Sequence, residues 1–388
     1  MASGTPGLAR GARGVPGALA LVIIGTLAAF LIGESAFRLV GLKAREAGRI
    51  FRISNGANLQ FPGRAGHTVI DLYSSNPRGM FPIDLNDETT RRWLITRKFT
   101  RVDEARRTNP FGVPFEYNSR GFRDRDFTPK PPGTKRIVFV GDSFTEAQGV
   151  VETASSVRLV EAQLSRDGVV EAWNLGVRGH DFPDLEALFD AAMELSPDVV
   201  VFGMVLNDGE HDDAMHNRWP RVNDWIMVRQ EVPSWLERHS YLASFVANRY
   251  ELLRVSRDTA AWYRTLYSDE NRDGWGRTRA ALRRIQARCR DKGAAFGVAL
   301  WPLLVGLDTN GAYPFEGAHA QIRTGVERIG IPFVDLLPAL RGRDPSSLWV
   351  HSSDLHPNER AQALVAPVLV DFIESRLLNA ANPQPVAK

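Results

Sequence analysis

The chain has 388 residues, of which 44% are hydrophobic and 24% charged, so it can bury a sizeable core and is too apolar for a disordered protein. Its formal net charge is only +3 and its arginines are scattered, which argues against a nucleic-acid-binding protein. The single cysteine, Cys289, excludes an intramolecular disulfide and a cysteine-based zinc site. It shares a predicted helical face with Leu282 and Ile285, which indicates a small buried side chain.

The N-terminal region differs from the rest of the chain. Residues 1–14 are rich in Gly and Arg and predict a flexible arm. Residues 15–33 carry no charge and, at about 1.5 Å per residue, nearly cross a hydrocarbon core of roughly 30 Å. We therefore predict a single transmembrane anchor at 15–33. A cleaved signal peptide is the alternative, but no clear small-residue cleavage site follows the run.

Residues 34–130 are mixed and turn-rich, and predict an irregular N-terminal subdomain. From 131 to 378 strand-like and helical segments alternate, which predicts a parallel sheet covered by helices on both faces. The predicted strands are 136–140, 169–173, 198–203, 294–300 and 331–335. The predicted helices are 153–166, 182–194, 276–291, 316–328 and 358–377. We expect residues 379–388 to form a disordered tail.

A long insertion, about 211–274, separates the third and fourth predicted strands. It is rich in Trp and Tyr, and part of it, 241–254, is predicted to be helical. The aromatic side chains have two interpretations. They form a lid or wall that shapes substrate choice, or they simply pack the insertion onto the core.

Two short motifs carry the chemistry. Ser143, in Gly-Asp-Ser-Phe-Thr, follows the first predicted strand, and His356, in Asp-Leu-His-Pro-Asn, directly precedes the last predicted helix. In an open α/β sheet both positions face the crevice where ligands bind. A Ser hydroxyl becomes a nucleophile when a neighbouring base, usually His, takes its proton. Ser143 is therefore the candidate nucleophile and His356 the candidate base, with His351 as the alternative base.

With the Gly after the second strand and Asn207-Asp208 after the third, these motifs resemble the SGNH/GDSL hydrolase superfamily over about 136–377. The upstream segment 117–124 is similar to the lead-in of membrane-anchored bacterial members. The resemblance implies a three-layer αβα sandwich with a five-stranded parallel sheet, here with one N-terminal transmembrane helix. It assigns Ser143, Asp354 and His356 to catalysis, although one residue rather than the usual two separates Asp354 from His356.

The resemblance also implies an oxyanion hole. Its donors are the backbone N–H groups of Ser143 and Gly179 and the side-chain amide of Asn207. Gly176 is a structural alternative to Gly179. The expected supporting residues are Asp142 in the first motif and Asp208 in the third. A metal site is suggested at His211, Asp212 and Asp213 only because these residues are adjacent. We expect them to form a solvated loop, and we expect the protein to hold neither a metal nor a cofactor.

The function implied is a serine esterase that removes an O-acyl group, such as acetyl, from a glycan or lipid. An O-acyltransferase using the same Ser-His site and a non-catalytic, membrane-anchored glycan-binding scaffold are the alternatives. Anchored relatives present this domain outside the cytoplasm, which implies a bacterial inner-membrane protein with an extracytoplasmic catalytic domain. The basic residues after the span argue for the opposite sidedness. Oligomeric state is left open.

Overall fold

The computed structural model describes residues 15–39, 113, 117–165, 169–178, 180, 182, 184–212, 221–222, 225–226, 235–243, 245–246, 260–351 and 354–378. The chain divides into two compact units. The helical unit combines Met1–Ile50 with Val228–Arg254, and the sheet unit combines Phe51–Met227 with Val255–Lys388. The predicted arm 1–14, most of 34–130, much of the insertion and the tail 379–388 lie outside the described residues.

The sheet unit is built on five parallel strands in the order β2-β1-β3-β6-β7. They are β1 (Lys135–Gly141), β2 (Val170–Gly176), β3 (Val199–Met204), β6 (Ala295–Leu300) and β7 (Phe333–Asp335). Gly141, the last residue of β1, pairs with Gly176 of β2 and Gly203 of β3. The loops that follow these three strands therefore leave the sheet at one edge.

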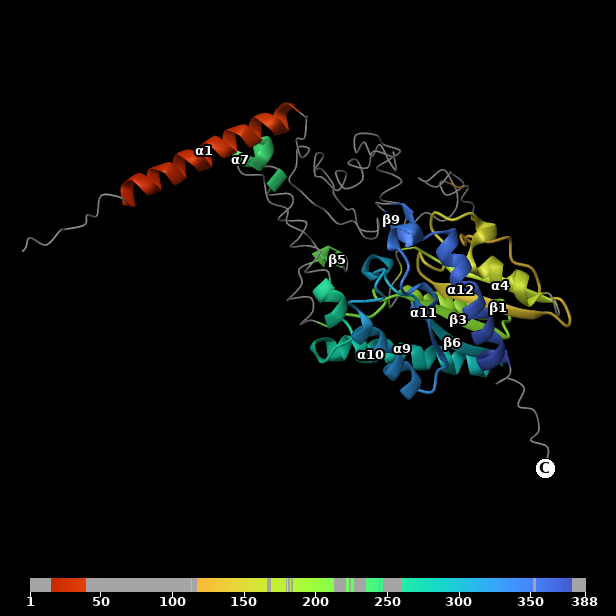
Figure 1. Ribbon diagram of the computed structural model, residues 1–388. Coiled ribbons are helices and arrows are strands. Elements are labelled where there is room, and N and C mark those ends of the chain that lie inside the picture. Colours follow the sequence, from red (N-terminus) through yellow and green to blue (C-terminus); the bar gives the residue numbers. More distant parts are fainter. Residues whose placement is uncertain are drawn as a thin grey trace, which may run out of the picture. The chain divides into compact units, whose positions relative to one another are not determined.

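Helices cover both faces of this sheet. They are α4 (Ser156–Leu164), α5 (Asp184–Glu194), α9 (Arg272–Asp291), α10 (Glu316–Arg328), α11 (Leu337–Leu340) and α12 (Glu359–Phe372), which continues as a π-helix, η5 (Ile373–Leu378). Short 3₁₀ turns are η1 (Glu152–Ala154), η2 (Asp269–Asn271), η3 (Leu304–Gly306) and η4 (Pro345–Leu348). In Figure 1, α4 and α12 lie on one side of the strands, and α9 and α10 lie on the other. The predicted αβα sandwich with a five-stranded parallel sheet is confirmed.

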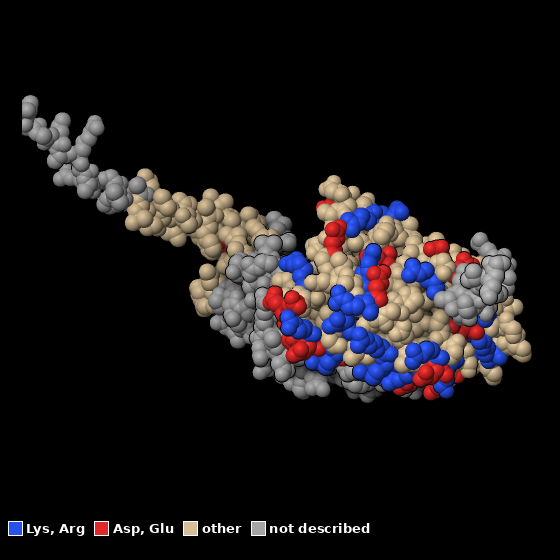
Figure 2. Space-filling view, turned by 90° about the horizontal axis from the view of Figure 1, so that it is seen from below, with Lys and Arg blue, Asp and Glu red and all other residues tan. Residues whose placement is uncertain are grey.

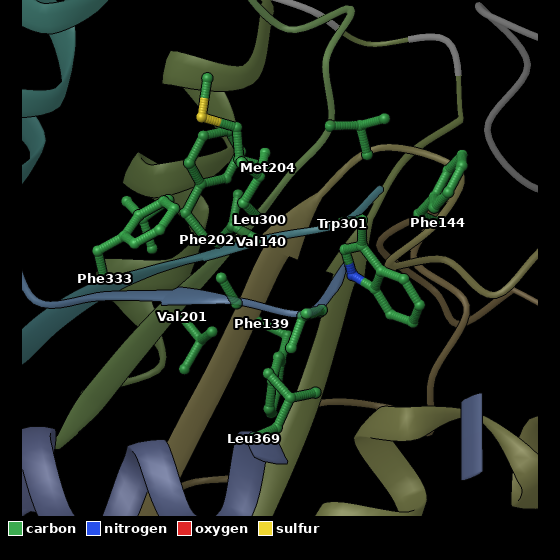
Figure 3. Close-up of a cluster of buried hydrophobic side chains, with 14 of the residues drawn as sticks. Phe139, Val140, Phe144, Val201, Phe202, Met204, Leu300, Trp301, Phe333 and Leu369 are labelled. Atoms are coloured by element: carbon green, nitrogen blue, oxygen red, sulfur yellow. The ribbon is translucent and has the colours of Figure 1, made fainter. Parts of the chain in front are cut away.

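The strands are apolar almost throughout because both of their faces are covered, as parallel sheets require. All six residues of β3 are buried. Figure 3 shows how they alternate: Phe139 and Val201 point toward Leu369 of α12, whereas Phe202 and Met204 point to the opposite side. On that opposite side Phe189 of α5 packs edge-on against Phe202, with ring centroids 5.7 Å apart.

The observed boundary of one helix differs from the predicted boundary because a side chain caps the helix. The predicted helix 153–166 is divided into η1 and α4, because Ser155 adopts an extended backbone and its hydroxyl accepts a hydrogen bond from the Arg158 N–H. Helix α10 occupies the predicted 316–328. Cys289 is 1% exposed among the packed residues of α9, so the predicted buried side chain is confirmed.

Among the described residues, two short hairpins lie outside the main sheet. One joins β4 (Arg221–Val222) to β5 (Trp225–Ile226) within the insertion. The other joins β8 (Trp349–His351) to β9 (Asp354–Pro357) just before α12. The insertion's last described part belongs to the core, where Trp262, Tyr263 and Tyr267 are buried. For these three side chains the packing interpretation holds.

Charges of opposite sign are mixed on the surface of the sheet unit. Figure 2 shows Lys and Arg interleaved with Asp and Glu on the face it displays. The arginines of α9 contribute to this pattern, because Arg284 pairs with Glu186 at 2.8 Å and Arg288 pairs with Asp190 at 3.1 Å. Each of these pairs joins α9 to α5.

The helical unit contains α1 (Val15–Leu39) and α7 (Trp235–His239). Within α1, Leu19–Leu39 has a mean hydropathy of 2.1, and none of the apolar window is buried in protein. Among the described residues, this is the one helix that is long and apolar enough to cross a membrane. A signal sequence meets the same two criteria.

Candidate active site

Ser143 lies in a tight turn directly after β1. The turn is held by backbone bonds from Glu146 N–H to the Asp142 carbonyl, at 2.9 Å, and from Gln148 N–H to the Ser143 carbonyl, at 3.1 Å. Gly141 is required beneath it, since a Cβ there would lie 2.2 Å from the Thr145 hydroxyl and 2.8 Å from the Gly203 carbonyl oxygen. The sheet edge thus fixes the position of the serine.

His356 reaches the same place from the other end of the chain. It lies in β9 rather than in the first turn of α12, so the hairpin, and not the helix, carries it. Asn358 fixes the junction: its side chain caps α12 by accepting from the Ala361 N–H, and its amide donates to the carbonyls of Ser347 and Trp349. As a result His356 Nε2 lies 2.8 Å from Ser143 Oγ, across 213 residues of sequence.

Two side chains from the serine loop border the imidazole. The amide of Gln148 lies 3.4 Å from His356 Nδ1. The Phe144 ring packs 5.4 Å from the imidazole and 5.9 Å from Trp301. For Nε2 to accept the serine proton, Nδ1 must carry the ring's hydrogen.

The side chains of Asp354 and His351 lie outside what the structure describes; their backbones pair across the β8–β9 hairpin. The Asp354–His356 unit therefore stays a prediction. Gly179 is also outside the described residues. Gly176 has a structural reason to be glycine, because a Cβ there would lie 2.2 Å from the backbone nitrogen of Glu146.

Asp142 and Asn207 meet beneath the serine. Burial raises the pKa of Asp142 to about 6, and hydrogen bonds from the Phe144 N–H and the Asn207 amide, with the nearby His356, act in the opposite direction. Asp142 Oδ1 accepts from the Phe144 N–H at 2.8 Å. The bond to Asp142 uses one of the two N–H donors of the amide and orients the Asn207 side chain.

Asp208 supports the loop that carries Asn207. Its carboxylate is fully buried and accepts from the Val205 N–H at 2.7 Å. From the far end of the insertion, the Tyr267 hydroxyl donates to the Leu206 carbonyl at 3.0 Å. Both bonds hold the backbone of 205–208, which is the orienting role expected for Asp208.

The sequence did not identify Arg123 as part of the site. Its guanidinium is 2% exposed and donates to the carbonyls of Glu146, at 3.0 Å, of Ala147, at 2.6 Å, and of Val150. Ala147 has a φ of 58°, a left-handed conformation that strains a residue with a Cβ. The resemblance of 117–124 to a lead-in segment was the only signal, and it gave no role to Arg123.

A second buried charge lies beside this loop. The Glu146 carboxylate is paired with Arg178 at 2.5 Å and accepts from the Tyr117 hydroxyl at the same distance. Arg178 directly precedes the predicted oxyanion residue Gly179. Glu146 therefore connects the serine loop to the loop after β2.

Within the described part of the chain, no group of three His, Cys, Asp or Glu side chains could hold a metal ion. His211 stacks on Trp262, with ring centroids 5.3 Å apart. Asp213, the third member of the adjacent set considered from sequence, is not among the described residues.

A comparison with known proteins identifies the family. The family model of the GDSL-like lipase/acylhydrolases matches residues 139–364, which is more than half of the chain. The chain belongs to this family. Its members hydrolyse ester bonds, so the protein is an ester-hydrolysing enzyme. The comparison with curated proteins gave no match.

Several solved structures are similar at low identity. A crystal structure of TesA is 16% identical and covers 62% of this chain and 97% of its own, with a TM-score of 0.36. A lipase/acylhydrolase from Enterococcus faecalis is 17% identical and covers 65% and 100%, with a TM-score of 0.36. A mutant acetylxylan esterase from Geobacillus stearothermophilus is 16% identical and covers 62% and 94%, with a TM-score of 0.36.

Proposed function

We propose that the protein is a serine esterase in which Ser143 attacks the acyl carbon of an ester and His356 moves the proton. The hydrogen bond of 2.8 Å between Ser143 Oγ and His356 Nε2, at the sheet edge where ligands bind in open α/β folds, is the observation that carries the proposal.

In the first half-reaction the Ser143 oxygen bonds to the carbonyl carbon while its proton passes to His356 Nε2. The tetrahedral oxyanion accepts hydrogen bonds from the proposed donors, which are the Asn207 amide and the backbone N–H groups of Ser143 and Gly179. As the tetrahedral species collapses, the alcohol leaves with the proton from His356. In the second half-reaction His356 takes a proton from water as the water oxygen bonds to the acyl carbon. The bond to the Ser143 oxygen then breaks, His356 returns the proton to that oxygen, and the acid is released. Asp354 is proposed to steady the imidazolium.

For the substrate we propose a small O-acyl group, such as acetyl, on a glycan or lipid. If a sugar hydroxyl instead of water resolves the acyl-enzyme, the same residues perform an acyl transfer. The two activities are separated by incubating the enzyme with an acetyl ester and a sugar acceptor. An esterase releases acetate, whereas a transferase produces an acetylated sugar, and a non-catalytic scaffold consumes no ester.

The test of the site compares matched variants of the full chain with an activated acetyl ester. Ser143→Ala and His356→Ala should each lower kcat by several orders of magnitude, while Ser165→Ala, at an exposed serine outside the site, should not. Unchanged turnover in Ser143→Ala would reject the nucleophile. Loss of activity in His351→Ala together with full activity in His356→Ala would reassign the base.

We also propose that α1 is a retained anchor and that the catalytic domain lies outside the cytoplasm. The apolar run supports the anchor, and the resemblance to anchored bacterial relatives supports the sidedness. Alkaline phosphatase fused after Lys388 is active only outside the cytoplasm. A silent phosphatase fusion, with a fluorescent green-fluorescent-protein fusion at the same position, would reverse the sidedness and shift the substrate class toward inner-leaflet lipids or precursors.

A further inference from the structure

Within the helical unit, part of the insertion docks on the end of α1. The Glu34 carboxylate accepts hydrogen bonds from the Ser240 hydroxyl at 2.7 Å, the Tyr241 N–H at 3.0 Å and the Leu242 N–H at 2.9 Å. These donors begin a short helical turn, so Glu34 caps a segment more than 200 residues distant in sequence.

Arg38, one turn further along α1, holds the same segment. Its guanidinium pairs with Glu34 at 2.6 Å, donates to the His239 carbonyl at 2.7 Å and lies over the Tyr241 ring at 4.9 Å. Phe37 packs against Phe245 with ring centroids 4.9 Å apart. Figure 1 shows α7, which ends at His239, beside α1.

The docked segment presents apolar side chains outward. Trp235 is 66% exposed, Leu236 is 48% exposed and Val246 is 56% exposed. On α1, Leu31 and Ile32 are also exposed, at 63% and 71%. Large exposed apolar side chains that adjoin an apolar helix of membrane-spanning length fit a lipid surface, and Trp is enriched at the boundary between lipid and water.

We propose that Trp235–Val246 is a second, membrane-interfacial element of the anchor: Glu34 and Arg38 hold it on the end of α1, and Trp235, Leu236 and Val246 contact the bilayer. The docking residues Glu34, Phe37 and Arg38 belong to α1, so the element rests on the proposal that α1 is retained.

Site-directed spin labelling of the full chain in lipid nanodiscs tests this surface. Burial raises the pKa of Cys289 to about 12, so the native thiol stays unlabelled at neutral pH. A label on Val246→Cys should be more accessible to lipid-soluble oxygen than to an aqueous nickel complex. Leu27→Cys, in α1, should behave alike, and Val169→Cys, at a valine of the sheet unit that is 67% exposed, should favour the nickel complex. Equal nickel accessibility at 246 and 169 would overturn the proposal.

Glu34→Gln tests the docking in the Val246→Cys background. It keeps the side-chain shape but removes the charge, and one oxygen becomes an amide donor facing other donors. We expect the label at 246 to become several-fold more accessible to nickel while the label at 27 does not change. A label at 246 that stays in lipid in this variant would show that Glu34 does not fix the segment, and recovery of a mature chain lacking α1 would contradict the proposal outright.

Discussion

The contact between Arg123 and the serine loop gives the sharpest prediction about the site. Arg123→Met keeps much of the aliphatic volume and removes donors from the carbonyls of Glu146, Ala147 and Val150. A buried acceptor left without its donor costs about 1–3 kcal/mol. Removing a buried cation recovers part of that cost, because burial disfavours the charged guanidinium and lowers the pKa of Arg123. We therefore expect a net loss of about 2–4 kcal/mol in the free energy of unfolding.

For a unit of this size, such a loss corresponds to a fall of roughly 5–15 °C in the thermal midpoint. The loop also carries Gln148 toward His356, so kcat should fall by more than KM changes when both are measured well below the midpoint. Arg123→Lys should give an intermediate result, because one ammonium cannot reproduce the planar fork of a guanidinium.

Arg120→Met is the matched control. Arg120 lies three residues away on the same segment, is 42% exposed and pairs with Glu194, which is 60% exposed. Such a surface pair contributes about 0–1 kcal/mol. Thermal midpoints are read from tryptophan fluorescence of the full chain in detergent, beside the rate of ester hydrolysis. If Arg123→Met is no less stable and no less active than Arg120→Met, the reasoning about the loop is wrong.

Three further predictions concern the same edge of the sheet. Asn207→Ala should lower kcat by roughly 10²-fold with little change in KM, because the oxyanion bond strengthens in the transition state; a change confined to KM would make Asn207 a substrate-binding residue. Burial raises the pKa of Asp142 to about 6, so its contribution to stability is present at low pH and should decline as the pH rises from about 4 to about 6, and Asp142→Asn should flatten the pH profile of unfolding relative to the parent. Parallel profiles would contradict this. Ala147→Gly should raise the thermal midpoint slightly or leave it unchanged, because relief of the left-handed strain, about 1–2 kcal/mol, offsets the flexibility of glycine in the unfolded chain; clear destabilisation would refute the strain.

The sequence predicts the sheet, and it predicts Ser143 and His356 as facing site residues, because the patterns that indicate them each lie within one short segment. Apolar runs mark β1 and β3, and the polar residues directly after them, Ser143 and Asn207, necessarily lie at the carboxyl edge of a parallel sheet. The capped, periodic helix α12 likewise fixes the chain just before it. These features depend on spacing along one segment, which a sequence displays directly.

The contacts that the sequence did not predict join distant segments through backbone groups. Arg123 donates to three backbone carbonyls. Every residue has such a carbonyl, so the residue types do not indicate which ones act as acceptors. Nothing near Glu34 in the sequence indicates that it accepts hydrogen bonds from Ser240–Leu242, more than 200 residues away. The β8–β9 hairpin is too short for a periodic pattern, so the element carrying His356 appeared only in the structure.

Active-site labelling is the most direct test of the catalytic assignment. A fluorophosphonate reacts covalently with a serine only when a neighbouring base activates it. We predict that the full-length protein is labelled at one site, that mass spectrometry of the peptides places the phosphonate on Ser143, and that His356→Ala abolishes the reaction. Label found on another serine, or labelling that persists unchanged in Ser143→Ala, would contradict the account.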